Sequence, residues 1–183
     1  MVFFENIRYK IARMILRRRV AKLKRQKTLY DFASAKSIGL LCSPNDVFST
    51  VHLKDFLNYL SHKKIKYSVF GYFDGKTIPE NFLYLKDFDF ITQQELNFWF
   101  IPKGPTVDKF INEPFDMLID CNINSFFPIE YISHLSKAKC KVGVMRQGSE
   151  TCYDLMIDIT KNKTLEYYLE NLGIYLTNLR QAQ

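Results

Sequence analysis

The residues best suited to a chemical task are ten basic side chains near the start of the chain. No acidic residue interrupts the segment that holds them, and nothing within it neutralises their charge. They are Arg8, Lys10, Arg13, Arg17, Arg18, Arg19, Lys22, Lys24, Arg25 and Lys27. Lysine binds phosphate as a point charge, and arginine can bind it through two parallel hydrogen bonds. We therefore expect this segment to bind a polyanion.

The positive charge of the chain is concentrated in this one segment. The 183 residues carry a formal net charge of +7. Residues 1–36 hold eleven Lys/Arg and two acidic residues, whereas the rest of the chain holds 15 basic and 17 acidic residues. Such asymmetry is typical of contact with nucleic acid or with an anionic membrane surface.

Two aspartates offer a second possibility, because Asp120 and Asp158 each end a predicted buried strand. The carboxyl ends of parallel strands meet at one edge of a sheet, where ligands usually bind. Two carboxylates there could hold a divalent cation or share acid and base duty. Strand-end aspartates also commonly cap loops, and no third ligand or base accompanies this pair. We therefore predict no metal site and assign no catalytic residue.

Other chemical motifs are absent or weak. The turn after the first predicted strand is Cys-Ser-Pro-Asn-Asp, without the glycines of a dinucleotide-binding loop, so no cofactor is predicted. Residues 146–149 (RQGS) could form a small anion nest or a plain turn. No G-x-S-x-G motif occurs. His52, His62 and His134 are expected on helices as surface or interface residues, with His134 near a helix end that favours a cation.

The body of the chain alternates predicted strands and helices. A helix starts at Ser43 to Asp46, with Leu53, Phe56, Leu57 and Leu60 as its buried stripe, and others follow Thr106, Pro128 and Thr164. The predicted strands are 37–42, 66–73, 96–101, 115–120, 140–145 and 153–159, with a less legible strand at 88–91. Near-continuous apolar strands between helices predict a three-layer, Rossmann-like α/β fold with a mostly parallel sheet. We expect Trp99, in the third strand, to belong to the core.

A basic N-terminal helix is predicted before this body, with residues 1–33 forming the helical segment and residues 34–183 the α/β domain. No Gly or Pro occurs between Phe4 and about Lys27. Phe4, Ile7, Ile11 and Met14, with Ile15, follow helical spacing and form a candidate face for the body or for a protein partner. After Ile15 the stripe breaks, and the next apolar residues lie on nearly the opposite side of the helix: Leu16, Val20 and Leu23. The second half of the helix is therefore charged almost all round.

One sequence pattern occurs twice, and the cysteines form no motif. The pattern aromatic-Asp-x-x-Ile-Asp appears at 115–120 and at 153–158, which indicates two strands that solve the same packing problem in one sheet. Cys42, Cys121, Cys140 and Cys152 form no Cys-x-x-Cys pair, so we expect buried, reduced thiols.

The chain resembles a family of short, uncharacterised bacterial proteins through its basic leader, FDMLID, AKCKVGV and YDLMID segments. That resemblance implies no catalytic residue. Residues 115–144 also resemble the N-terminal half of heptosyltransferase-type glycosyltransferases. Those enzymes have two Rossmann-like halves with a sugar nucleotide between them, and this chain has room for one half.

The preferred functional prediction is a non-catalytic module that docks on structured RNA or ribosomal particles. An all-round basic helix suits an RNA groove, where phosphates approach from several sides. The first alternative is attachment to an anionic membrane through the apolar face at 3–15. The second is a single-domain enzyme related to glycosyltransferase halves. The apolar start ends at Glu5, too short for a signal peptide, and we expect a cytoplasmic protein.

Overall fold

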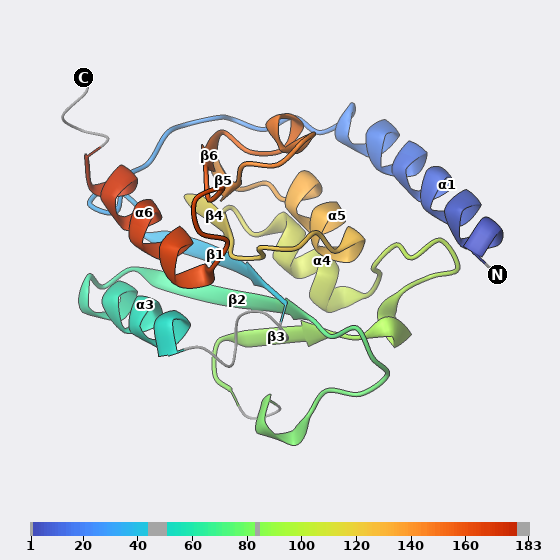
Figure 1. Ribbon diagram of the computed structural model, residues 1–183, viewed down its shortest axis with the longest axis horizontal. Coiled ribbons are helices and arrows are strands. Elements are labelled where there is room, and N and C mark those ends of the chain that lie inside the picture. Colours follow the sequence, from blue (N-terminus) through green and yellow to red (C-terminus); the bar gives the residue numbers. More distant parts are fainter. Residues whose placement is uncertain (1, 44–50, 83–84, 179–183) are drawn as a thin grey trace.

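A six-stranded, all-parallel sheet forms the centre of the molecule, in the order β3-β2-β1-β4-β5-β6 (Figure 1). The computed structural model describes residues 2–43, 51–82 and 85–178. The strands are β1 (Ser37–Cys42), β2 (Lys66–Tyr72), β3 (Phe88–Ile91), β4 (Met117–Asp120), β5 (Cys140–Val144) and β6 (Leu155–Ile157). This strand order is that of doubly wound nucleotide-binding folds. The predicted Rossmann-like fold with a parallel sheet is confirmed.

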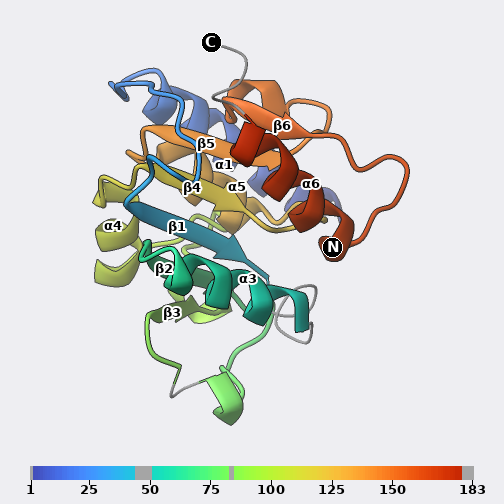
Figure 2. The ribbon, with the colours of Figure 1, turned by 90° about the vertical axis from the view of Figure 1, so that its left-hand side faces the viewer.

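Helices cover both faces of the sheet, as Figures 1 and 2 show. On one face lie α3 (Val51–His62) and α6 (Leu165–Asn178), and on the other lie α4 (Pro105–Asn112) and α5 (Phe127–Leu135). The N-terminal helix, α1 (Val2–Val20), contacts α5 rather than the sheet. It therefore adds a further layer outside the three that the sequence predicted.

The sheet separates two apolar clusters of the core, and a third, smaller cluster lies between α1 and α5. The larger of the first two lies under α3 and α6 and includes the predicted stripe of Leu53, Phe56, Leu57 and Leu60, all buried. The other lies under α4 and α5, where Phe110, Ile129 and Ile132 pack on the strands. All four cysteines are free and buried, as predicted.

The repeated sequence pattern corresponds to a repeated packing device. Phe115 and Tyr153 each lie against a glycine on a neighbouring strand, so a Cβ at Gly39 or Gly143 would lie 2.8 or 2.6 Å from the ring. The aspartate that follows each ring accepts backbone N–H groups from the start of a neighbouring strand, Asp116 from Ser37 and Asp154 from Lys141. The prediction that these two strands solve the same packing problem in one sheet is confirmed.

The predicted strand at 96–101 is wrong. Residues 96–102 form turns closed by one antiparallel bridge between Leu96 and Pro102, and the third strand in sequence is β3. The Asn97 side chain accepts hydrogen bonds from the backbone of Trp99 and Ile101, and Phe100 adopts a φ of 58°. A left-handed residue and a side chain that captures backbone donors both prevent an extended strand. Trp99 is accordingly only partly buried.

Element ends differ by a few residues from those predicted. The helix expected after Thr106 begins at Pro105, with Gly104 as its N-cap. Asn45 and Asp46 of the predicted helix start, and Leu179 at the end of the last helix, lie outside the described residues.

Candidate functional site

The basic helix ends earlier than its composition suggested. α1 stops at Val20, and the chain continues through a turn into an extended segment that runs across the sheet edge towards β1 (Figure 1). Thr28 N–H donates to the Lys139 carbonyl before β5. Among the cations beyond Val20, Lys22 lies in the turn and the others in the segment after it, so none of them is presented by a helix.

The face of α1 that packs on the body is not the predicted apolar stripe. Ala12 and Leu16 are buried against Phe127, Tyr131 and Leu135. The small Ala12 side chain lets the two helices approach closely. By contrast, Phe4 is 70% exposed, Ile7 38% and Met14 46%, and Ile11 is only partly buried. Of the predicted stripe, Ile15 packs on this cluster, whereas Leu16, expected on the opposite face, is the larger residue that docks on the body. The alternative, that Phe4, Ile7, Ile11 and Met14 contact a protein partner, stays a prediction.

Three arginines of α1 hold the helix to the body. Arg8 donates to the Phe98 carbonyl at 2.6 Å, and its guanidinium lies 3.8 Å from the Phe100 ring centroid. Arg13 forms two hydrogen bonds of 3.1 Å with the Glu130 carboxylate on α5. Arg19 donates to the Tyr131 hydroxyl.

Arg25 forms the most deeply buried ion pair of the N-terminal segment. It makes two hydrogen bonds of 2.6 Å to Asp154, and the side chains are 8% and 9% exposed. It also donates to the carbonyls of Ala138 and Lys139. Burial pushes the pKa of Asp154 upward, but the bonds from Arg25 and from Lys141 N–H outweigh it and keep that pKa below its usual value. Lys27, 72% exposed, lies 3.2 Å from the same carboxylate.

The remaining five cations of the segment face solvent. They make no ion pair or hydrogen bond through their side chains within the described part of the chain, and all five are exposed: Lys10, Arg17, Arg18, Lys22 and Lys24. The ten predicted binding residues thus divide into an inner set with protein partners and this outer set. The outer set is the candidate polyanion surface.

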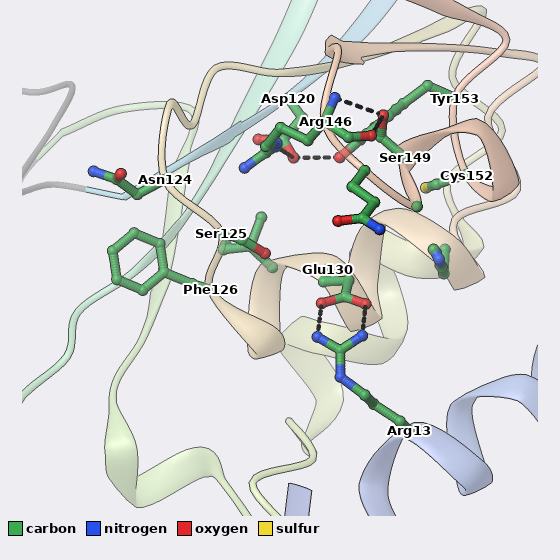
Figure 3. Close-up of a pocket in the computed structure, with 14 residues that line it drawn as sticks. Arg13, Asp120, Asn124, Ser125, Phe126, Glu130, Arg146, Ser149, Cys152 and Tyr153 are labelled. Atoms are coloured by element: carbon green, nitrogen blue, oxygen red, sulfur yellow. Dashed lines mark hydrogen bonds and ion pairs between the residues drawn. The ribbon is translucent and has the colours of Figure 1, made fainter. Parts of the chain in front are cut away.

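A cavity of about 160 Å³ opens at the carboxyl edge of β4 and β5 (Figure 3). Asp120, Arg146 and Tyr153 lie together at one end of it, and the Arg13–Glu130 pair lies at the other. The first turn of α5 supplies a further wall. Because Arg13 belongs to α1, the basic helix forms part of this cavity.

Asp120 is the centre of a buried hydrogen-bond network. It is 2% exposed, and its carboxylate accepts from the Tyr153 hydroxyl and from both the backbone and the side chain of Asn122. Burial, followed by the charge of Asp120, raises the pKa of Tyr153 well above its usual value, so this phenol stays protonated and donates. Gly143 makes the network possible, because only a residue without Cβ lets the Tyr153 ring cross β5.

Arg146 extends from the turn after β5 towards Asp120. Its Nη2 atom lies 3.6 Å from the carboxylate, while its Nη1 atom is buried and has no hydrogen-bond partner among the residues that the structure describes. The turn behind it is closed by Ser149, whose hydroxyl accepts from Arg146 N–H and donates to the Arg146 carbonyl, and by Gly148 at a φ of 86°. Residues 146–149 therefore form a tight turn that aims one guanidinium into the cavity.

The structure does not bring Asp158 into this site. Its exposed carboxylate accepts from Thr160 N–H, which makes it a loop cap, and it does not line the cavity. Hydrogen bonds from Thr160 lower its pKa. Among the described residues, no group of three His, Cys, Asp or Glu side chains could hold a metal ion.

A model of a protein family matches residues 8–179, from the first half of α1 to the end of the last helix. The chain belongs to a family of unknown function, DUF6913. No curated protein and no solved structure gives a significant match. The similarity of 115–144 to heptosyltransferase-type enzymes finds no support here and remains a prediction. Within the described ranges, no helix has both the length and the apolar character to cross a membrane.

The last turn of α5, beside the cavity, contacts the buried side chain of Lys141. Lys141, 2% exposed, donates to the carbonyls of Ser133 and His134 in the last turn of α5, and burial lowers its pKa to about 8. Burial, reinforced by the charges of Lys141 and Arg13, lowers the pKa of His134 to about 4. The end of α5 was expected to favour a cation, and Lys141 rather than His134 supplies it. His62 is exposed and His52 is partly exposed beside Glu166, so both lie at the surface, as predicted.

The sequence did not indicate that Tyr153 and Arg146 meet at Asp120. It also did not indicate that Arg25 pairs with Asp154. The repeated aromatic-Asp pattern did indicate that Tyr153 and Asp154 are structurally important, because the same residue types recur at Phe115 and Asp116. Nothing in the local sequence connects Arg25 to a carboxylate 129 residues away.

We expect Arg25→Gln to lower the free energy of unfolding by about 3 kcal/mol, because it leaves Asp154 buried without its partner. Lys24→Gln, one residue away and exposed, is the matched control and should change it by less than about 0.5 kcal/mol. Chemical denaturation of both variants measures the difference. Equal midpoints for the two variants would show that the ion pair does not stabilise the fold.

We expect the stability of the protein to fall between pH 6.5 and pH 4 partly through His134. The unfolded chain binds a proton at an ordinary pKa of about 6.5, whereas the folded chain resists it until about pH 4. His134→Gln should therefore lose less stability across this window than the wild type, by up to about 3 kcal/mol. His52→Gln is the control. Parallel stability curves for wild type and His134→Gln would contradict the assignment.

Proposed function

We propose that this protein binds structured RNA, including ribosomal RNA, through Lys10, Arg17, Arg18, Lys22 and Lys24. The observation that carries the proposal is the division of the basic segment. Five cations are held by protein partners, and these five point to solvent without a counter-charge from the described residues. The five cations with protein partners stabilise the fold. Fold stability does not explain why the five exposed positions are basic.

The absence of neighbouring acidic side chains makes the outer set costly for the isolated protein. No Asp or Glu lies between Arg8 and Lys27 in the sequence. Like charges on adjacent helical turns repel each other, and the repulsion ends when a polyanion supplies the opposite charge. Release of counterions from the nucleic acid then drives association.

The arrangement of the outer set favours RNA over a flat anionic surface. Arg17 and Lys10 share one side of α1 and Arg18 occupies another, whereas Lys22 and Lys24 follow on the turn and extended segment beyond Val20. Cations that point in different directions suit a groove in which phosphates approach from several sides. Arginines in this set can also bind a phosphate bidentately.

Attachment to an anionic membrane is the second candidate, and the exposed apolar flank of α1 favours it. Phe4, Ile7 and Met14 are exposed on the helix rather than packed on the body. Such side chains could insert into the headgroup region while neighbouring lysines and arginines bind anionic lipid. The flank covers only the first part of α1, and no comparable apolar face accompanies Lys22 and Lys24.

Replacing all five outer cations by Gln should abolish most RNA affinity at low salt. In a filter-binding or mobility-shift assay with structured RNA, the slope of log affinity against log salt should become shallower by about 4, because about five phosphate contacts are lost. The matched control replaces five exposed lysines elsewhere: Lys54, Lys66, Lys86, Lys161 and Lys163. An equal loss in the control would show a non-specific charge effect and contradict the proposal.

Deletion of residues 1–30 is a poor substitute for this experiment. It would also remove Arg25 from Asp154 and expose the face of α5 that α1 covers. Loss of binding after that deletion would therefore not separate an RNA contact from unfolding.

Phe4→Ser, Ile7→Ser and Met14→Ser together should leave RNA affinity unchanged, because the flank carries no phosphate contact. The same triple variant should lose any sedimentation with phosphatidylserine-containing vesicles, while Ile174→Ser, an exposed apolar residue on α6, should not. Vesicle binding by wild type that exceeds its RNA binding, and that disappears in the triple variant, would favour the membrane candidate over RNA.

A further inference from the structure

The cavity at the carboxyl edge of the sheet is lined by a charged side chain with one donor that the described residues leave unpaired. Arg146 Nη1 is buried and has no hydrogen-bond partner among the described residues. A buried donor without an acceptor costs free energy, and the cost is larger for a charged group. An acceptor from outside the described residues, such as a ligand oxygen, would satisfy this guanidinium.

Asp120 orients Arg146 but does not satisfy it. One carboxylate oxygen of Asp120 accepts two hydrogen bonds from Asn122, and the other accepts from Tyr153. The distance of 3.6 Å to Arg146 Nη2 is too long for a good hydrogen bond. The network fixes the position of the carboxylate, which in turn holds the guanidinium by charge in the wall of the cavity, where the Arg146 side chain is 25% exposed.

The first turn of α5 adds a second source of positive potential at the same cavity. Phe126 is the N-cap of this nine-residue helix and makes no side-chain capping hydrogen bond. Ser125, Phe126 and Ile129 line the cavity on this side (Figure 3). A helix N-terminus carries partial positive charge and free N–H donors, which favour an anion. The exposed Ser125 hydroxyl is a further donor at the rim.

The size of the cavity limits what it can hold. Sites for drug-sized ligands measure about 300–1,000 Å³, whereas this cavity measures about 160 Å³. It can enclose one charged group of a ligand but not a complete nucleotide. Phosphate and carboxylate both present oxygens that match a guanidinium.

We propose that this cavity binds a single oxyanionic group, a phosphate or a carboxylate, of a small ligand, with Arg146 as its principal binding side chain. Asp120 acts as the positioning residue, because it touches Arg146 and not the anion. The N–H groups of Phe127 and Ile129 in the first turn of α5 and the Ser125 hydroxyl complete the donors, because Pro128 has no N–H and Glu130 N–H donates to the Phe126 carbonyl. This site is separate from the outer cations of the N-terminal segment and does not depend on RNA binding.

The test uses the full chain, labelled with ¹⁵N, and two probes, inorganic phosphate and acetate, titrated at constant ionic strength with chloride as the balancing anion. We expect saturable shifts of the amide signals of Gly148, Ser149 and the first turn of α5 with at least one probe below about 20 mM. Arg146→Gln should weaken binding about tenfold or more. Lys54→Gln, an exposed cation on α3 across the sheet, should leave it unchanged.

Arg146→Lys guards against misreading a folding defect, because it keeps the charge and loses the planar fork. It should retain a native spectrum and bind with an affinity between those of the wild type and Arg146→Gln. The proposal is overturned by no saturable shift with either probe, by shifts that chloride reproduces, or by equal affinities in wild type and Arg146→Gln. The probe that binds more tightly identifies the anion class.

Discussion

The buried ion pair between Arg25 and Asp154 determines which side of the N-terminal segment faces the protein. Two hydrogen bonds of 2.6 Å join these side chains, and the same aspartate accepts the backbone N–H of Lys141 at the start of β5. A cation from the beginning of the chain is thus bonded to the edge of the central sheet. Removing either partner would leave a charge in a poorly hydrated site, which is far more costly than losing a surface pair. The pair therefore anchors the extended segment, and the packing of α1 on α5 fixes the helix before it.

This anchoring links the basic segment to the cavity. Arg13 reaches from α1 to Glu130, and the pair lies at one end of the cavity, with the Asp120 network at the other (Figure 3). One helix thus presents an inner arginine to a candidate ligand site and outer cations to solvent. The basic residues thus fall into two groups, because those with a fixed protein partner hold the segment to the fold, and those without one form the surface proposed to bind a polyanion.

Much of the fold could be predicted from the sequence, because strand and helix periodicity and the apolar runs are local signals. The stripe at Leu53 to Leu60 and the paired patterns at Phe115 and Tyr153 correspond to real packing. The strand at 96–101 was wrong because Asn97 and the φ of Phe100 decide that segment, and neither is visible in hydropathy. The predicted apolar stripe of α1 is also not the main face that packs on α5. Helical spacing identified an apolar stripe, but contact with α5 required a small residue, Ala12, and that choice depends on the partner surface. The candidate sites were least predictable, because the bonds from Arg25 to Asp154 and from Tyr153 to Asp120 join distant parts of the chain.

Chemical footprinting of lysine and arginine side chains, with and without structured RNA, tests the division of the basic segment most directly. In the free protein, Arg17, Arg18, Lys22 and Lys24 should react readily, and Arg25 should be protected by Asp154. Adding RNA should protect the outer residues and leave Arg25 unchanged. Rapid modification of Arg25 in the free protein, or unchanged reactivity of all the outer cations with RNA present, would contradict the account.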